Sequence, residues 1–199
     1  NGLQVTAGDR CVSWLPFYHD MGLVGFVLGP IASQLSVDYL STRDFAMRPR
    51  QWLSLMTKSQ ATISFSPSFG YELCVRRLGE ESPEQFDLSH WRIAGVGTET
   101  IRAESLLRFS STLGPSGFRQ ESFLACYGMA ECSLAISFAP LGQGLDVDQV
   151  DGDWLSNEKE ALPFMASLSS EENGRCSSFV NCGVPLPGYE VEIRDADGF

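Results

Sequence analysis

The stretch Phe-Leu-Ala-Cys-Tyr-Gly-Met-Ala-Glu, residues 123–131, decides how the rest of the chain is interpreted. Residues 123–126 are mostly apolar and predict a short buried strand. The aromatic face of Tyr127 suits a flat base, and Gly128 lets the backbone turn sharply and approach a ligand closely. Glu131 follows the strand end, where open α/β sheets place their ligands, and its carboxylate suits a Mg²⁺ that carries phosphates. The same residues are also typical of a buried strand, a turn and a solvated glutamate.

Short apolar segments alternate with helical patterns on both sides of this stretch. Strands are predicted at residues 11–15, 37–40, 61–65, 91–97 and 134–138, and helices at residues 21–33, 48–59, from 67 onward and 102–113. This alternation indicates an α/β fold with a mostly parallel sheet flanked by helices. We expect that core to occupy residues 1–139.

The character of the chain changes after residue 139. Acidic residues crowd residues 140–178 and the periodicity fades, which predicts a solvated insertion within the same domain. Residues 182–188 are typical of a rigid turn, and residues 189–194 alternate like a half-exposed strand. We therefore expect residues 179–199 to begin a following β subdomain, and the chain to be a piece of a longer protein.

Composition excludes several classes of function. The net charge of -11 disfavours binding to nucleic acid, which relies on Lys and Arg. The six cysteines show no C-x-x-C spacing and only two histidines accompany them, so we expect no zinc site and a reducing, cytoplasmic compartment. The longest apolar run, residues 22–32, is too short to span a bilayer.

Three further segments could contact a ligand. His19 follows a predicted strand end and could donate to a carboxylate, or it could be a loop histidine bonded to backbone. Residues 95–100 could place glycine backbone beside a flat ring. Thr100 replaces the third glycine of a dinucleotide-binding loop, however, so a plain strand-to-helix turn is also an open interpretation. Residues 66–71 could line an apolar pocket or begin a helix that packs into the core.

These segments, in this order, resemble the adenylate-forming superfamily of acyl and aryl ligases and luciferases, and within it the fatty acyl-AMP ligases. Residues 14–23, WLPFYHDMGL, resemble the family segment LPxxHDMGL, and residues 127–131, YGMAE, resemble its YGxTE motif. Residues 93–101 correspond to the loop whose backbone lies along adenine. Further matches lie at residues 66–74, 87–92 and 182–188, so the resemblance covers nearly the whole chain.

The resemblance implies a role for each matching residue. Tyr127 would stack on adenine, Glu131 would hold the Mg²⁺ that bridges the phosphates of ATP, and His19 would lie at the carboxylate end of the acyl pocket. His19 and Glu131 are the catalytic candidates. The implied nucleotide-binding set is Gly97, Thr98, Glu99, Tyr127, Gly128, Met129 and Ala130, and the implied acyl-pocket set is His19, Ser66, Phe69 and Gly70.

The chain departs from the superfamily pattern at two positions. Ala130 replaces a threonine, which removes one hydroxyl contact to the α-phosphate and is common among fatty acyl-AMP ligases. Thr100 replaces a usual proline, which bears on the conformation of that loop. The glycine-rich phosphate loop, the ribose-binding aspartate, the hinge and the catalytic lysine would lie outside residues 1–199. We therefore expect this chain alone to be inactive or nearly so.

The resemblance implies that the parent protein activates a fatty acid with MgATP, giving acyl-adenylate and pyrophosphate. The acyl group would then pass to the phosphopantetheine arm of an acyl carrier protein, and the insertion at residues 140–178 would hinder transfer to coenzyme A. A long-chain fatty acyl-CoA ligase on the same scaffold is an alternative. A non-catalytic remnant that binds a ligand or a partner is another. A nicotinamide-dependent reductase is disfavoured by the glycine pattern.

Overall fold

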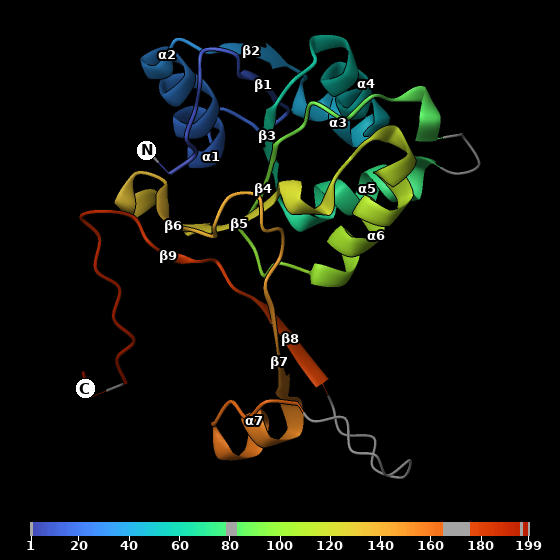
Figure 1. Ribbon diagram of the computed structural model, residues 1–199. Helices are drawn as coiled ribbons and strands as arrows, with labels where there is room; N and C mark the ends of the chain where they lie inside the picture. The colour runs from blue at the N-terminus through green and yellow to red at the C-terminus, as the bar shows by residue number, and fades with distance from the viewer. Residues whose placement is uncertain (1, 79–82, 165–175, 196, 199) are drawn as a thin grey trace.

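A computed structural model of the chain describes residues 2–78, 83–164, 176–195 and 197–198. Within them lies a seven-stranded sheet with the strand order β2-β1-β3-β4-β5-β6-β9 (Figure 1). Its strands are β1 (Arg10–Ser13), β2 (Ser36–Tyr39), β3 (Ile63–Ser66), β4 (Ile93–Val96), β5 (Phe123–Gly128), β6 (Ala135–Phe138) and β9 (Val184–Pro185). The first five are parallel, whereas β6 is antiparallel to β5 and β9 is antiparallel to β6. The predicted α/β fold with a mostly parallel sheet is confirmed.

Helices cover both faces of this sheet. One side carries α1 (Asp20–Leu23), the π-helical segment η1 (Val24–Leu28) and α2 (Gly29–Ser33). The other carries α3 (Thr42–Met47), α4 (Arg50–Ser59), α5 (Ser68–Leu78) and α6 (Ala103–Leu113), as Figure 1 shows. Short 3-10 segments are η2 (Pro83–Gln85), η3 (Gly114–Ser116), η4 (Gln120–Ser122) and η5 (Ala130–Cys132). Within the described ranges, no helix is long and apolar enough to cross a membrane.

Aromatic side chains fill the core beneath α4 and α5. Trp52, Tyr71 and Trp91 are each at most 1% exposed, and the rings of Trp52 and Trp91 lie 5.1 Å apart in an edge-to-face arrangement. The polar atoms of these rings are paired, because Trp52 Nε1 donates to Ser64 Oγ at 2.9 Å and Tyr71 Oη donates to the Gly95 carbonyl at 2.9 Å. These bonds join α4 to β3 and α5 to β4.

Three predicted segments differ from the structure. The helix expected over residues 21–33 is interrupted by the π-helical turn η1, a distortion that often accompanies functional sites. Residues 189–194 do not form the strand that their alternation predicts, since no described strand lies beside them to share hydrogen bonds and Ile193 is 97% exposed. The acidic segment contains a strand, a helix and a further strand that its fading periodicity did not predict.

That acidic segment builds a small sheet of its own. Strands β7 (Val147–Asp151) and β8 (Cys176–Val180) pair antiparallel, and α7 (Gly152–Glu158) follows β7 directly. Asp151 caps α7 by accepting from the backbone N–H of Asp153 and Trp154. Figure 1 shows this unit projecting from the seven-stranded sheet. Residues 165–175 of the predicted insertion lie outside the described residues, and the division into core, insertion and following β subdomain stays a prediction.

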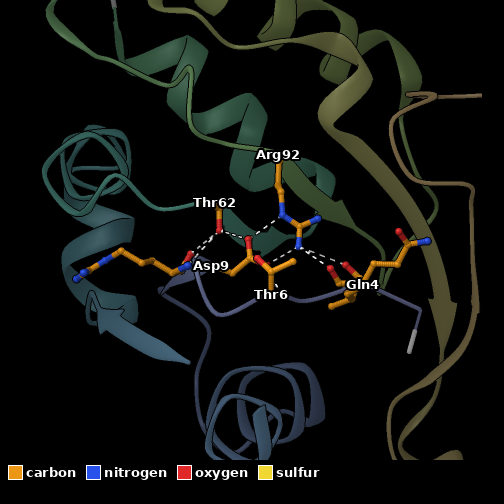
Figure 2. A network of polar contacts seen from close by, with 7 residues as sticks. Gln4, Thr6, Asp9, Thr62 and Arg92 are labelled. Atoms are coloured by element: carbon orange, nitrogen blue, oxygen red, sulfur yellow. Dashed lines mark hydrogen bonds and ion pairs between the residues drawn. The ribbon is translucent and has the colours of Figure 1, made fainter. Parts of the chain in front are cut away.

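A polar network ties together the starts of three parallel strands (Figure 2). Asp9 precedes β1, Thr62 precedes β3 and Arg92 precedes β4. Asp9 is only 4% exposed, and Arg92 donates to both of its carboxylate oxygens. Nε donates to Oδ1 at 2.7 Å, and Nη2 donates to Oδ2 at 2.6 Å. Thr62 Oγ1 donates to Asp9 at 2.7 Å, as does the backbone N–H of Thr6. Charge-assisted, bidentate bonds of this kind are among the strongest polar contacts in proteins.

We expect this network to make stability sensitive to acid. Hydrogen bonds from Arg92 hold the pKa of the Asp9 carboxyl well below its usual range. The folded state therefore binds fewer protons than the unfolded state, so the contribution is complete above about pH 4 and is lost as pH falls below that value. Asp9→Asn should lower the free energy of unfolding by about 2 kcal/mol at pH 7. In urea titrations from pH 7 to pH 2, the free energy of unfolding of the variant should fall less steeply with acid than that of the wild type. Parallel curves for the two proteins would contradict this assignment.

Candidate active site

A cavity of about 460 Å³ lies between the α1–η1–α2 side and the facing surface of the sheet. This volume falls within the range of small-molecule sites. Its polar end is formed by His19, Thr98 and Tyr127, and its apolar end includes Cys11, Ile63 and Phe65. The cavity therefore suits a ligand with one polar and one hydrocarbon end.

The polar end forms because the carboxyl ends of parallel strands meet at one edge of the sheet. His19 follows β1, Thr98 follows β4, and Tyr127 lies near the end of β5. Gly128 and Ala130 line the same cavity. The structure thus brings together five of the predicted site residues, from segments that are up to 111 positions apart in the sequence.

Close backbone packing explains the glycines at this edge. A Cβ on Gly128 would lie 1.8 Å from the Leu134 carbonyl oxygen, and one on Gly97 would lie 2.7 Å from the Cys126 carbonyl oxygen. Thr98, which follows Gly97, has a φ of +71°, a left-handed conformation that is strained for a β-branched residue. Strained backbone of this kind clusters at ligand sites. The bare, tightly held backbone at these positions can approach the face or edge of a planar ring.

His19 has one ring nitrogen held by the protein. Its Nδ1 lies 3.1 Å from the backbone N of Met21, at the N-cap of α1, and 2.6 Å from Asp20 Oδ1; it accepts from Met21 when unprotonated and donates to Asp20 when protonated. The ring also lines the cavity. These contacts are those of the loop histidine bonded to backbone, one of the two interpretations of the sequence. They leave Nε2 as the nitrogen that could contact a ligand, and that role stays a prediction.

Three predicted acyl-pocket residues do not line the cavity: Ser66, Phe69 and Gly70. Ser66 is fully buried, and a Cβ on Gly70 would lie 2.0 Å from its Oγ. Phe69 packs edge-on against Trp14 at 5.9 Å and is 39% exposed. These contacts are those of a helix start packed into the core, the second interpretation offered by the sequence. Their role toward an acyl chain stays a prediction.

The remaining predicted residues each follow a residue of the cavity lining in the sequence, and we call these positions the rim: Glu99, Met129 and Glu131. Glu99 Oε1 accepts from the backbone N–H of Phe69 at 3.1 Å and so joins the loop after β4 to the start of α5. Met129 and Glu131 are exposed, the latter in η5. No cluster of three or more metal-binding side chains occurs among the described residues. A single carboxylate at Glu131 fits Mg²⁺, which commonly takes one or two carboxylates together with substrate phosphates and water.

The apolar lining was missed by sequence reasoning. Cys11 and Ile63 are register partners on β1 and β3, and Phe65 lies two residues beyond Ile63 on the same face. Alternation along the strands carries this signal, but only once strand order and register are known. Burial raises the pKa of Cys11 to about 11 and that of Cys126 to about 12, so both thiols stay neutral and act as small apolar groups in the wall.

The fold and the cavity together define a class: an open α/β protein that binds its ligand at the carboxyl ends of its parallel strands. A model of the family described as AMP-binding enzyme matches residues 1–199, and the chain belongs to that family.

Relatives of known sequence and structure agree with this placement. The chain is 48% identical over 198 residues to a putative acyl-CoA synthetase of Caulobacter vibrioides, covering 100% of this chain and 34% of that protein. It is 34% identical over 188 residues to a medium-chain-fatty-acid–acyl-carrier-protein ligase of Moorena producens, covering 94% of this chain and 31% of that protein. The chain spans about a third of the length of these relatives.

Two solved structures show the same fold. One comes from a study of fatty acyl-adenylate ligases from E. coli and L. pneumophila, with a TM-score of 0.93, 50% identity, and coverage of 100% of this chain and 35% of that one. The other is a fatty acyl-adenylate ligase from L. pneumophila in complex with acyl adenylate and pyrophosphate, with a TM-score of 0.89, 33% identity, and coverage of 98% and 33%. The resemblance to fatty acyl-AMP ligases is confirmed.

Proposed function

We propose that the full-length protein containing this chain activates a fatty acid by adenylation. A carboxylate oxygen of the fatty acid attacks the α-phosphorus of ATP, the bond from that phosphorus to the bridging oxygen breaks, and its electron pair leaves with pyrophosphate. The observation that carries this proposal is the single cavity that joins a polar end at His19, Thr98 and Tyr127 to an apolar end on the sheet face. An acyl-adenylate has the same division into a polar nucleotide and a hydrocarbon tail.

The residues of the polar end would hold the reactants in line for attack. Tyr127 stacks on adenine, with Gly128 leaving room for the ring. His19 Nε2 donates to the fatty acid carboxylate, oriented by the contacts at its Nδ1. Glu131 would hold Mg²⁺, which would supply positive charge to neutralise the phosphates. The remaining members of the nucleotide set are Gly97, Thr98, Glu99, Met129 and Ala130.

The acceptor of the acyl group is proposed to be the phosphopantetheine arm of an acyl carrier protein. Support comes from the relative described as an acyl-carrier-protein ligase. The relative described as a putative acyl-CoA synthetase favours coenzyme A instead. The β7–α7–β8 unit would decide between them by hindering the motion that transfer to coenzyme A requires.

The test supplies the full-length protein with labelled fatty acid, MgATP and one of three acceptors: coenzyme A, a carrier with the phosphopantetheine arm, or the same carrier without it. We expect the adenylate to persist with coenzyme A and with the unmodified carrier, and to be consumed by the modified carrier. Ready formation of acyl-CoA would overturn the choice of acceptor. Absence of any adenylate would favour the binding-only alternative.

A deletion tests the role of the β7–α7–β8 unit. Val147 and Val180 are register partners, so their Cα atoms lie about 5 Å apart and a two-residue turn can replace residues 148–179. We expect this variant to keep adenylate formation and to gain transfer to coenzyme A. Unchanged transfer would mean that the unit does not control the acceptor.

A further inference from the structure

The segment before β1 closes the apolar end of the cavity. Leu3 and Val5 line the cavity and are half-buried. Cys11 and Ile63, at the starts of β1 and β3, line the same end. The polar residues lie at the opposite edge, because a strand advances about 3.3 Å per residue and β3 spans four residues, roughly 10 Å from Ile63 to its last residue. Leu3 and Val5 thus stand where the far end of an acyl chain would stop.

The segment with Leu3 and Val5, which we call the wall, is held in place by hydrogen bonds from Arg92 rather than by regular secondary structure. Residues 3–6 belong to no helix or strand, and Gln4 has a φ of +46°. Arg92 Nη2 donates to the carbonyl oxygens of Leu3, at 3.4 Å, and Gln4, at 3.2 Å, while the same guanidinium grips Asp9 (Figure 2). The bonds from Arg92 reach backbone atoms of the wall, so they fix its position whatever side chains it carries.

We propose that Asp9 and Arg92 form a positioning pair that fixes the wall of Leu3 and Val5 and thereby sets the length of acyl chain that the site accepts. This inference rests on the proposed fatty acid adenylation. It assigns no chemical step to either residue of the pair, since both act through the backbone of the wall.

Changes in the wall should shift chain-length preference in opposite directions. Val5→Ala and Leu3→Ala deepen the cavity and should move the optimum toward longer chains. Val5→Trp fills it and should move the optimum toward shorter chains. Each methylene that gains or loses an apolar contact should change kcat/KM by about fourfold. Leu3 and Val5 are half-buried near the surface, so these variants test the inference without depending on a variant of the buried pair.

Changes in the pair should broaden the preference instead. Arg92→Met keeps much of the apolar stem and removes every donor. Selectivity between the best chain and one two carbons longer should fall by about fivefold or more, and the KM for ATP should not change. Arg92→Lys can still pair with Asp9, but it lacks the fork that reaches Asp9 and two carbonyls together. It should recover stability more fully than selectivity, which a purely structural role would not produce.

The experiment measures kcat/KM for adenylate formation by the full-length protein across saturated fatty acids of increasing length. Arg10→Ala is the matched control, since Arg10 lies at the same edge of the sheet and its guanidinium pairs with Asp38 at 3.8 Å, away from the Leu3 and Gln4 carbonyls. Opposite shifts for Val5→Ala and Val5→Trp, with an unchanged control profile, are the expected result. An unchanged profile in active wall variants would overturn this inference alone. A wild-type protein that adenylates no fatty acid would overturn the proposed function and this inference with it.

Discussion

Glu131→Ala is expected to slow acyl-adenylate formation by about 10²–10³-fold, the usual scale for removing one electrostatic group from a reacting centre. The side chain is exposed in η5, at the rim that follows β5. Its removal leaves no cavity in the core, so the free energy of unfolding should stay within about 0.5 kcal/mol of wild type. Glu131→Gln keeps the shape and loses the charge, and should be nearly as slow because the proposed role is to hold a divalent cation.

Glu121→Ala is the matched control for this prediction. Glu121 is another exposed acid in a 3-10 turn, η4, at the opposite end of the same strand. The measurement is single-turnover adenylate formation across a range of Mg²⁺ concentrations, with unfolding followed in urea. Partial recovery of Glu131→Gln at high Mg²⁺ would agree with a weakened metal site. A loss no larger than that of Glu121→Ala would exclude Glu131 from the reaction.

Gly128→Ala is expected to damage both stability and activity. The added Cβ would lie 1.8 Å from the Leu134 carbonyl oxygen and 3.0 Å from the Cα of Ala135, so β5 and β6 must move apart. Backbone atoms cannot yield as a flexible side chain can, and we expect a cost of about 3 kcal/mol. Leu134 and Ala135 line the cavity with Gly128, so the displaced edge should also lower adenylate formation by about 100-fold.

Gly114→Ala provides the comparison. A Cβ there would meet nothing within 4 Å apart from its neighbours in the chain, and the φ of -54° is not left-handed. Because Pro115 follows and disfavours a Cβ in this helical conformation, this variant should lose about 1 kcal/mol at most and keep full activity, as judged by urea titration and by the adenylation rate. Wild-type behaviour of Gly128→Ala in both measurements would show that the β5–β6 junction is not as tight as the structure has it.

The polar edge of the site could be predicted from sequence because local pattern determines it. Short apolar segments end shortly before His19 and Thr98 and close to Tyr127, and parallel strands bring such ends together. The position of this edge follows from spacing and residue type. The roles of its residues toward a nucleotide and a metal are implied by the family resemblance and stay predictions.

The apolar end could not be predicted because it depends on contacts between distant segments. Leu3 and Val5 lie in a stretch without periodicity, and their position depends on Arg92, 89 residues beyond Leu3. Likewise, alternation over residues 189–194 specifies which side chains would face inward but supplies no neighbouring strand. The periodicity of residues describes one segment at a time. The wall of the cavity and the pairing of a strand both depend on a second segment that is distant in the sequence.

In the proposed function, one cavity holds a nucleotide and a fatty acid for adenylation. The most direct measurement incubates the full-length protein with fatty acid and MgATP, without any acceptor, and quantifies acyl-AMP and pyrophosphate by mass spectrometry. We predict that both form in equal amounts, only when fatty acid is present, and that Glu131→Ala suppresses both. Release of ADP and phosphate without acyl-AMP, or no turnover of ATP with any fatty acid, would contradict the claim.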